Sequence, residues 1–386
     1  MNIAYAYEHC ADDIDFQSGY PFFILEQLRK RSRIVELFPL DLRTRYVFGP
    51  KVLFHRFRGQ TYRPDREPLL LKSLASQIAR QVEAGRPDCV FSPASSALSF
   101  LDIDVPKVFC ADATFANVID AYREYSGCTD DYVRQAHAQE ARALETCAAA
   151  IYPSHFAAMS AVEHYGADPD KVHILPFGAN IDVPPRHAVE AAIAQRTLEP
   201  MRILFNGRDW TRKGGDIVLQ ACEIAHRQGV RLRLDLVGPD TTPPLPSFAT
   251  LHGMLRKSHP GQRRRFERLL AESDLLFMPS RAENYGIALC EAAAYGIPSL
   301  SSAVGGIPTI VQADISGYAL PAGSPPEAYA AVIRDCAADL ERYRTLCHSS
   351  RRHYEQQLSW ERFGDGLMRI LRHPSRAEKE MAAAAG

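Results

Sequence analysis

Short apolar segments alternate with longer helical stretches along most of this 386-residue chain, and this alternation is the strongest constraint on its fold. The first apolar segment, residues 3–7, is separated from the next, residues 34–37, by a helical stretch at residues 21–30. Strands that alternate with helices in this way form parallel sheets that are covered on both faces. The sequence therefore predicts an α/β fold.

The predicted strands fall into two successive groups. A break at residues 178–200, which contains Pro184, Pro185 and Pro200, separates the groups. The first group comprises residues 3–7, 34–37, 89–92, 107–110, 149–153 and 173–176, and the second comprises residues 202–207, 232–237, 275–279 and 298–300. Two domains are expected, at residues 1–178 and 179–357, with the ligand in a cleft between them at the carboxyl ends of the strands.

The C-terminal segment, residues 358–386, is expected to differ from both domains. A helix at residues 360–371 should return toward the first domain, and the alanine-rich end, residues 381–386, should be disordered.

Composition excludes some classes of protein. A net charge of −1, with 46% hydrophobic and 24% charged residues, is ordinary for a packed enzyme and gives no general attraction to nucleic acid. Between residues 29 and 72 the chain has twelve Lys and Arg but only four Asp and Glu. This basic stretch indicates an anionic acceptor, a peripheral contact with a lipid surface, or simply a solvated face.

The cysteines and the hydropathy pattern indicate a cytoplasmic protein. The nine cysteines are odd in number and form no CxxC pair, which suits a reducing compartment and argues against a zinc site. No apolar run approaches the roughly 20 residues that span a bilayer. His137 and Glu140 share a predicted helix at residues 137–150 but have no third ligand, so they are interpreted as surface or cleft-edge residues.

Two glutamates separated by seven residues, Glu283 and Glu291, provide the strongest functional signal. The segment follows the strand at residues 275–279, and Gly286 precedes a helix that extends to Tyr295. The free amides of Gly286, Ile287 and Ala288 at the start of this helix could bind a diphosphate. The helix rises about 7.5 Å from Gly286 to Glu291. Glu291 could therefore accept hydrogen bonds from a ribose while Glu283 faces a transferred sugar.

The spacing alone would fit solvated helix charges, but its position after a strand and across a glycine favours a ligand site. The segment resembles the Glu-x7-Glu motif of the retaining glycosyltransferases of family 4. That resemblance implies the GT-B fold, in which two Rossmann-like, doubly wound parallel-sheet domains face each other across a cleft. It also implies sugar-donor contacts by Asn284 and Tyr285.

A second loop, residues 205–216, joins a strand to a helix and combines glycines with cations. Arg208 and Lys213 match the Gly-Arg … Lys-Gly loop of the same family, where both cations hold the diphosphate of the sugar donor. Gly214-Gly215 is followed by Asp216, so the loop is not a P-loop. An ion pair between Arg208 and Asp209 is the alternative interpretation.

Two positions in the first domain also resemble the family. Ser18-Gly19 matches a glycine loop beside the phosphates of the sugar donor, and an ordinary strand-to-helix turn is its alternative. Asp112 stands at the carboxyl end of the strand that contains residues 107–110. Many family members carry histidine at this position, whereas the lipopolysaccharide heptose glucosyltransferases resemble this chain in having Ala-Asp. Asp112 is the candidate polar group at the reacting sugar, or else it caps the next turn.

The resemblance also places the nucleobase against the backbone near Met254. The candidate catalytic residues are Asp112, Arg208, Lys213 and Glu283. The candidate residues for binding the sugar donor are Gly19, Arg208, Lys213, Met254, Glu283, Asn284, Tyr285, Gly286, Ile287, Ala288 and Glu291.

The resemblance implies a retaining, metal-independent enzyme of the hexosyltransferase type. It would move sugar from a nucleoside-diphosphate sugar to a glycan, glycolipid or small-molecule acceptor, without a cofactor. A GT-B sugar-nucleotide epimerase, a glycan phosphorylase and an inactive sugar-nucleotide-binding protein are the alternatives, although no segment singles out the lysine that a phosphorylase needs for pyridoxal phosphate.

Overall fold

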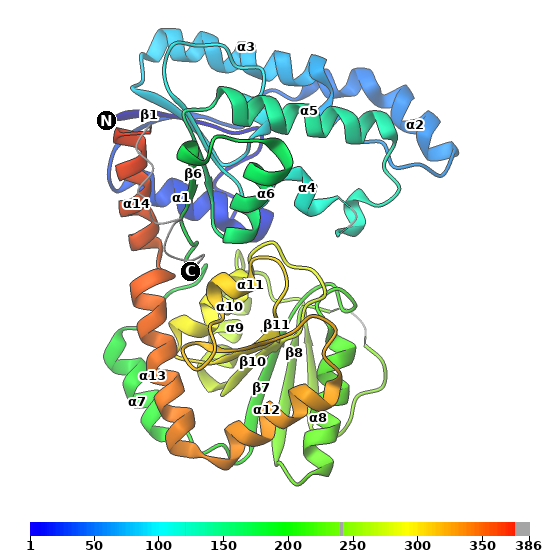
Figure 1. Ribbon diagram of the computed structural model, residues 1–386, viewed down its shortest axis with the longest axis vertical. Coiled ribbons are helices and arrows are strands. Elements are labelled where there is room, and N and C mark those ends of the chain that lie inside the picture. The colour runs from blue at the N-terminus through cyan, green and yellow to red at the C-terminus, as the bar shows by residue number, and fades with distance from the viewer. Residues whose placement is uncertain (120, 240–241, 375–386) are drawn as a thin grey trace. The chain divides into compact units, whose positions relative to one another are not determined.

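The computed structural model, which describes residues 1–119, 121–239 and 242–374, contains two six-stranded sheets with flanking helices (Figure 1). All paired strands within each sheet run parallel. The predicted α/β fold with two parallel-sheet domains is therefore confirmed. The expected disordered tail, residues 381–386, lies outside the described residues.

The chain divides into two compact units. The first contains Met1–Asp13 and Tyr20–Leu175 and takes up the chain again from Phe363, whereas the second contains Ile14–Gly19 and Pro176–Arg362. The short N-terminal segment Ile14–Gly19 thus belongs to the second unit although it is surrounded in sequence by the first.

The first sheet has the strand order β2-β1-β3-β4-β5-β6. Every residue of the strands Cys89–Ser92, Lys107–Cys110 and Ala149–Tyr152 is buried, and Ile78 and Ala157 from flanking helices pack in the same core. The strands are β1 (Asn2–Ala6), β2 (Arg33–Leu37), β3 (Cys89–Ser92), β4 (Lys107–Cys110), β5 (Ala149–Tyr152) and β6 (Val172–Ile174). The helices of this part are α1 (Tyr20–Arg29), α2 (Gly49–Phe57), α3 (Pro68–Gly85), α4 (Phe115–Val118), α5 (Asp130–Thr146) and α6 (His155–Tyr165).

The second sheet has the strand order β12-β11-β10-β7-β8-β9. Val218 and Tyr329, from two flanking helices, pack in its core. The strands are β7 (Met201–Asn206), β8 (Leu232–Val237), β9 (Ala249–Gly253), β10 (Leu275–Met278), β11 (Ser299–Ser302) and β12 (Gly317–Leu320). The remaining helices are α7 (Arg186–Gln195), α8 (Gly215–Arg227), α9 (Pro260–Glu272), α10 (Ile287–Ala294), α11 (Ile307–Ile310), α12 (Pro326–Ala338), α13 (Leu340–Gln357) and α14 (Trp360–Arg372).

The structure corrects one interpretation in the first unit. Helix α5 begins at Asp130, and Glu140 is only 2% exposed rather than lying at the surface. Its carboxylate accepts a hydrogen bond of 2.7 Å from the Ser95 hydroxyl, and burial raises the pKa of Glu140. Glu140 lies on the face of α5 that packs inward. It is therefore buried although its helical neighbour His137 is partly exposed.

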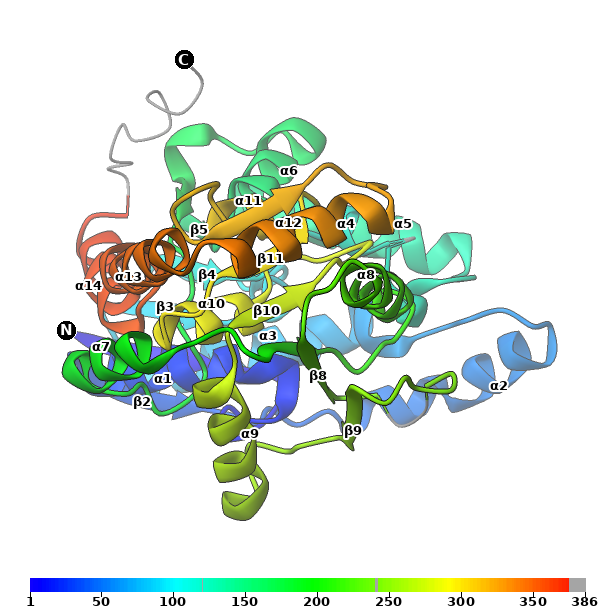
Figure 2. The same ribbon diagram turned by 90° about the horizontal axis from the view of Figure 1, so that it is seen from below.

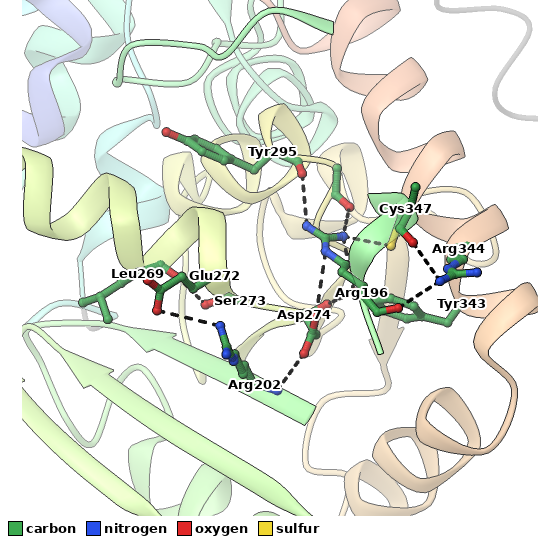
Figure 3. A network of polar contacts seen from close by, with 12 residues as sticks. Arg196, Arg202, Leu269, Glu272, Ser273, Asp274, Tyr295, Tyr343, Arg344 and Cys347 are labelled. Atoms are coloured by element: carbon green, nitrogen blue, oxygen red, sulfur yellow. Dashed lines mark hydrogen bonds and ion pairs between the residues drawn. The ribbon is translucent and has the colours of Figure 1, made fainter. Parts of the chain in front are cut away.

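The buried Arg196 connects the end of α10 and helix α13 with the residue before β10 (Figure 3). The Arg196 guanidinium donates to the carbonyl oxygen of Gly296 at 2.9 Å and lies 3.8 Å from the Asp274 carboxylate. The Tyr343 hydroxyl donates to the Asp274 carbonyl at 2.7 Å. Burial raises the pKa of Asp274, and the Arg196 charge opposes that rise. The network fixes α13 and the end of α10 at the start of β10.

Replacing Arg196 with methionine should lower the free energy of unfolding by about 3 kcal/mol, because the Asp274 carboxylate would stay buried without its cation. The loss should shrink at lower pH, since a carboxyl whose pKa is raised in the folded state is better tolerated there once it is protonated. Urea unfolding at several pH values would measure both effects.

Arg202→Met is the matched control. Arg202 pairs with Glu272 at 3.8 Å, and the side chains are 43% and 45% exposed, so the change should cost less than about 1 kcal/mol. Equal losses in the two variants would contradict a stabilising role for the buried pair.

Candidate functional site

The loop between β7 and α8 places Lys213 beside Glu283. The Lys213 ammonium donates to the Glu283 carboxylate and lies 3.7 Å from the Met278 sulfur at the end of β10. Gly214 has φ +76°, and a Cβ there would lie 2.2 Å from the Pro279 carbonyl oxygen. Only glycine fits this approach, so the two loops meet through backbone.

The Glu283 carboxylate lies among polar side chains, in the loop that follows the carboxyl end of β10. The Arg212 guanidinium is 3.7 Å from it, and the Ser280 hydroxyl is 3.5 Å from it. The backbone of Glu283 is fixed as well, since its carbonyl accepts from the Gly306 amide at 3.2 Å. A Cβ on Gly305, where φ is +54°, would lie 1.8 Å from this same carbonyl oxygen.

Further contacts connect the two loops. The Arg281 amide donates to the Arg212 carbonyl at 2.7 Å, and the Arg212 guanidinium donates to the Ala282 carbonyl at 2.9 Å. The Arg281 side chain forms a two-pronged pair with Asp216 at 2.8 and 2.7 Å, which lowers the pKa of Asp216. Lys213 and Glu283 are therefore held on one continuous framework.

Arg208 lies in the same loop but is exposed, and no ion pair is found for it among the described residues. Asp209 instead receives the Arg212 amide at 3.0 Å and lies 3.8 Å from the Arg212 guanidinium. The alternative interpretation, an Arg208–Asp209 pair, is thus not the arrangement found.

Helix α10 begins at the glycine between the two glutamates. Gly286 caps the helix with φ +108°, and the first amides of the helix, including those of Ile287 and Ala288, have no intrahelical acceptor. Asn284 and Tyr285 are buried, and the Tyr285 hydroxyl donates to the Phe177 carbonyl at 2.8 Å. The Tyr285 side chain thus packs within its own unit. Tyr285 would therefore contact a ligand through its backbone.

Glu291 is 1% exposed on α10, and the Lys257 ammonium donates to its carboxylate. Lys257 also lies 5.5 Å from the centre of the Phe266 ring. Sequence reasoning missed Lys257 because it belongs to no motif. A carboxylate charge away from water is costly without a cation, so an expectation that Glu291 is buried would have prompted a search for one.

The segment Ile14–Gly19 contacts the loop that carries Lys257. The Asp15 carboxylate accepts from the Ser258 hydroxyl at 2.5 Å and from the Ser258 amide at 3.3 Å. Gly19 has φ +85°, and a Cβ there would lie 2.6 Å from the Ile14 carbonyl oxygen. The structure places Gly19 in the same unit as Glu283 and Glu291. Asp15 is a second residue of the site that sequence reasoning missed.

Met254 follows the end of β9 and is 36% exposed. The preceding backbone is fixed, since the Gly253 carbonyl accepts from the Gly238 amide at 2.9 Å. His252 is held on both ring nitrogens, by Asp235 at 2.7 Å and by Arg265 at 2.8 Å. Met254 is thus an exposed side chain on a fixed strand end.

Asp112 lies in the first unit, directly after β4, and is partly buried. Burial of the Tyr20 side chain raises the pKa of Tyr20, and the charge of Asp112 raises it further. The N-cap of the following helix α4 is Thr114, which forms a capping box with Asn117. The other candidate residues all lie in the second unit.

The described residues contain no group of three or more His, Cys, Asp and Glu that could hold a metal ion. The arrangement consists of fixed cations, two carboxylates and a helix terminus, all of which lie at the carboxyl edge of one parallel sheet.

These features define a protein of the GT-B glycosyltransferase fold. Residues 25–183 match the family model described as Glycosyltransferase Family 4, and residues 200–339 match the model described as Glycosyl transferases group 1. The chain thus carries one domain of each description.

Among curated relatives, the chain is similar to two proteins named D-inositol 3-phosphate glycosyltransferase. It is 29% identical over 206 residues to that of Xylanimonas cellulosilytica, covering 49% of this chain and 48% of the relative. It is 33% identical over 245 residues to that of Geodermatophilus obscurus, covering 58% and 51%. The chain spans about half the length of these relatives.

Solved structures resemble the whole chain in fold. A glycosyltransferase from Rickettsia africae has a TM-score of 0.65 at 14% identity, covering 98% of this chain and 99% of the other. Anabaena Alr3699/HepE, solved in complex with UDP-glucose, has a TM-score of 0.62 at 17% identity, covering 96% and 99%.

Gly305→Ala should lower the free energy of unfolding by about 2–4 kcal/mol, since it combines left-handed strain with a clash against the Glu283 carbonyl. The loop would have to move, so affinity for a nucleoside-diphosphate sugar should fall as well. Thermal unfolding and calorimetric titration would measure the two effects.

Gly323→Ala is the matched control for this change. Gly323 also has a positive φ, +78°, but no atom lies within 4 Å of an added Cβ. It should cost about 1 kcal/mol from strain alone and leave ligand affinity unchanged. If the two alanine variants lost the same stability and the same ligand affinity, the clash at Glu283 would explain neither loss.

Proposed function

We propose that this protein is a retaining, metal-independent glycosyltransferase of the hexosyltransferase type. It would transfer sugar from a nucleoside-diphosphate sugar to the hydroxyl of a glycan, glycolipid or small-molecule acceptor, in surface glycan or glycolipid synthesis. The observation that carries the proposal is the pair of fixed carboxylates that flank the start of α10. Glu283 is held by Lys213, and Glu291 is held by Lys257.

In this proposal the diphosphate lies at the start of α10. Arg208, Lys213 and the amides of Gly286, Ile287 and Ala288 bind it and stabilise the negative charge that develops as it leaves. Glu291 accepts hydrogen bonds from the ribose, and Glu283 faces the sugar.

The acceptor hydroxyl attacks the anomeric carbon on the face from which the diphosphate departs. One carbon–oxygen bond forms, the other breaks, and an oxygen of the leaving phosphate takes the proton of the hydroxyl. Two charged side chains and a helix terminus supply the electrostatic stabilisation, so the proposed step needs no cofactor.

The nucleotide and the acceptor are inferred from separate observations. UDP sugars are the first sugar donors to test, because Alr3699/HepE was solved with UDP-glucose. An anionic acceptor is favoured by the names of the relatives and by Arg66 in the first unit. The Nε and Nη1 atoms of Arg66 are buried without a hydrogen-bond partner, although Asp65 lies 3.9 Å from its guanidinium.

The proposed compartment is the cytoplasm. All nine cysteines are free thiols in the structure, which fits a reducing environment. Among the described residues, no helix combines the length and the apolar character needed to cross a membrane.

The donor site can be tested by thermal unfolding across a panel of nucleoside diphosphates and their sugar conjugates. A ligand at about 100 times its Kd should stabilise the folded protein by about 2.7 kcal/mol. Glu291→Gln should weaken binding of that ligand about tenfold or more, because the charge that accepts the ribose hydrogen bonds is lost. Calorimetric titration would measure the affinity.

Glu272→Gln serves as the control, since Glu272 is 45% exposed at the end of α9 and should leave affinity unchanged. Slow release of nucleoside diphosphate from the bound sugar conjugate, without acceptor, would separate an enzyme from a binding protein. If no nucleotide stabilised the protein, the proposal would be wrong.

Asp112→Ala should reduce turnover about 100-fold while changing affinity for the sugar donor less than threefold, if this carboxylate acts at the reacting sugar. Asp104→Ala is a suitable control, because Asp104 is exposed on the loop before β4. Full activity of Asp112→Ala in a steady-state assay would remove Asp112 from the mechanism.

A further inference from the structure

One segment of the first unit exposes an unusual amount of apolar surface. We call residues 43–58 the α2 segment; it comprises the 3-10 helix Arg43–Phe48, helix α2 and Arg58. No residue of either helix is buried. The exposed large side chains are Tyr46 (69%), Val47 (66%), Leu53 (54%), Phe54 (54%) and Phe57 (83%).

Among the described residues, Lys51 and His55 attach helix α2 to its unit through one face of the helix. The Lys51 ammonium donates to Glu67 at 2.8 Å, and the His55 ring stacks on Tyr62 at 5.2 Å. Leu53, Phe54 and Phe57 are spaced to share another face, because residues three and four apart on a helix are neighbours. The helix therefore presents an apolar face that the described residues do not cover.

The charges of the α2 segment have a single sign. Residues 43–58 contain five Lys and Arg and no Asp or Glu. Arg45, Arg56 and Arg58 are exposed, and no ion pair is found for them among the described residues. The Arg58 guanidinium lies 5.5 Å from the centre of the Phe54 ring, and that of Arg45 lies 5.3 Å from the Tyr46 ring.

The position of α2 leaves this surface accessible within its unit. Figures 1 and 2 show α2 at the outer end of the first unit, beyond the strands of its sheet. An amphipathic helix that combines aromatic residues with arginines binds in the plane of a bilayer interface, where the apolar face enters the headgroup boundary and the cations meet anionic lipids.

We propose that the α2 segment docks the protein on the surface of an anionic bilayer. Leu53, Phe54 and Phe57 insert at the headgroup boundary, and Arg45, Arg56 and Arg58 pair with lipid phosphates. The complementarity of charge identifies the occupant, because Arg45, Arg56 and Arg58 have no balancing carboxylate among the described residues, whereas Arg43 and Lys51 pair with Asp41 and Glu67. This surface lies in the first unit and is independent of the proposed sugar-donor site in the second.

Co-sedimentation of the full chain with vesicles tests the proposal. The protein should bind phosphatidylcholine vesicles that contain phosphatidylglycerol, and binding should weaken at high salt and without the anionic lipid. Arg56→Gln combined with Arg58→Gln should weaken binding about 25-fold, since each cation near an anionic surface contributes about fivefold. Phe54→Ser combined with Phe57→Ser should weaken it at least about tenfold, because both rings lose their insertion.

Matched controls lie elsewhere on the same unit. Phe156→Ser removes an aromatic ring that is 39% exposed on α6, and Arg80→Gln removes an exposed cation on α3. Both should bind vesicles like the unaltered protein. All variants should keep their melting temperature and their affinity for nucleotide, so failure of vesicle binding would be distinct from failure of the proposed function.

Two outcomes would overturn the proposal. One is that the unaltered protein stays in solution with anionic vesicles, or that the Phe54/Phe57 variant binds them equally well. The other is that analytical ultracentrifugation finds a dimer that this double variant converts to a monomer. The apolar face would then be an interface between two copies of the chain.

Discussion

The geometry of the second unit depends on backbone packing around the loop between β10 and α10. Gly214 approaches this loop at Pro279, and Gly305 approaches it at Glu283, both at distances that exclude any side chain. Parallel strands bring these connections to one edge of the sheet. Once the loop is fixed from two sides, the carboxylate of Glu283 and the first amides of α10 have little freedom to move.

Two buried carboxylates of this unit, Glu291 and Asp274, are each paired with a cation from a distant part of the chain. Lys257 reaches Glu291 across 34 residues, and Arg196 reaches Asp274 across 78. Isolated charges are costly away from water, whereas a cation that also forms hydrogen bonds offsets much of that cost. The first pair lies on the side of the sheet where ligand groups are expected, and the second helps to hold α13 in place.

Much of this arrangement could be predicted because local signals specified it. The strand before Ser280, the glycine before Ile287 and the glycine pair after Lys213 each determine nearby backbone, and the structure has the expected strand, helix cap and loop at these positions. Lys257 and Asp15 were missed because their roles arise only from tertiary contacts. Glu140 was wrongly assigned to the surface because the helix was expected to begin at His137, whereas α5 begins seven residues earlier, at Asp130. The first turns of α5 carry the buried Tyr132 and Ala136, which mark the inward face that Glu140 shares. The roles of the candidate residues in chemistry remain predictions.

The membership of Ile14–Gly19 in the second unit has a consequence for protein engineering. A chimera that takes the second unit through a single junction near the middle of the chain would leave this segment behind. Here such a junction would pair Ser258 and Asn180 with a foreign segment in place of Asp15 and Ser18. A recombinant that is meant to inherit the second half intact should therefore carry two grafts, the long C-terminal one and this hexapeptide.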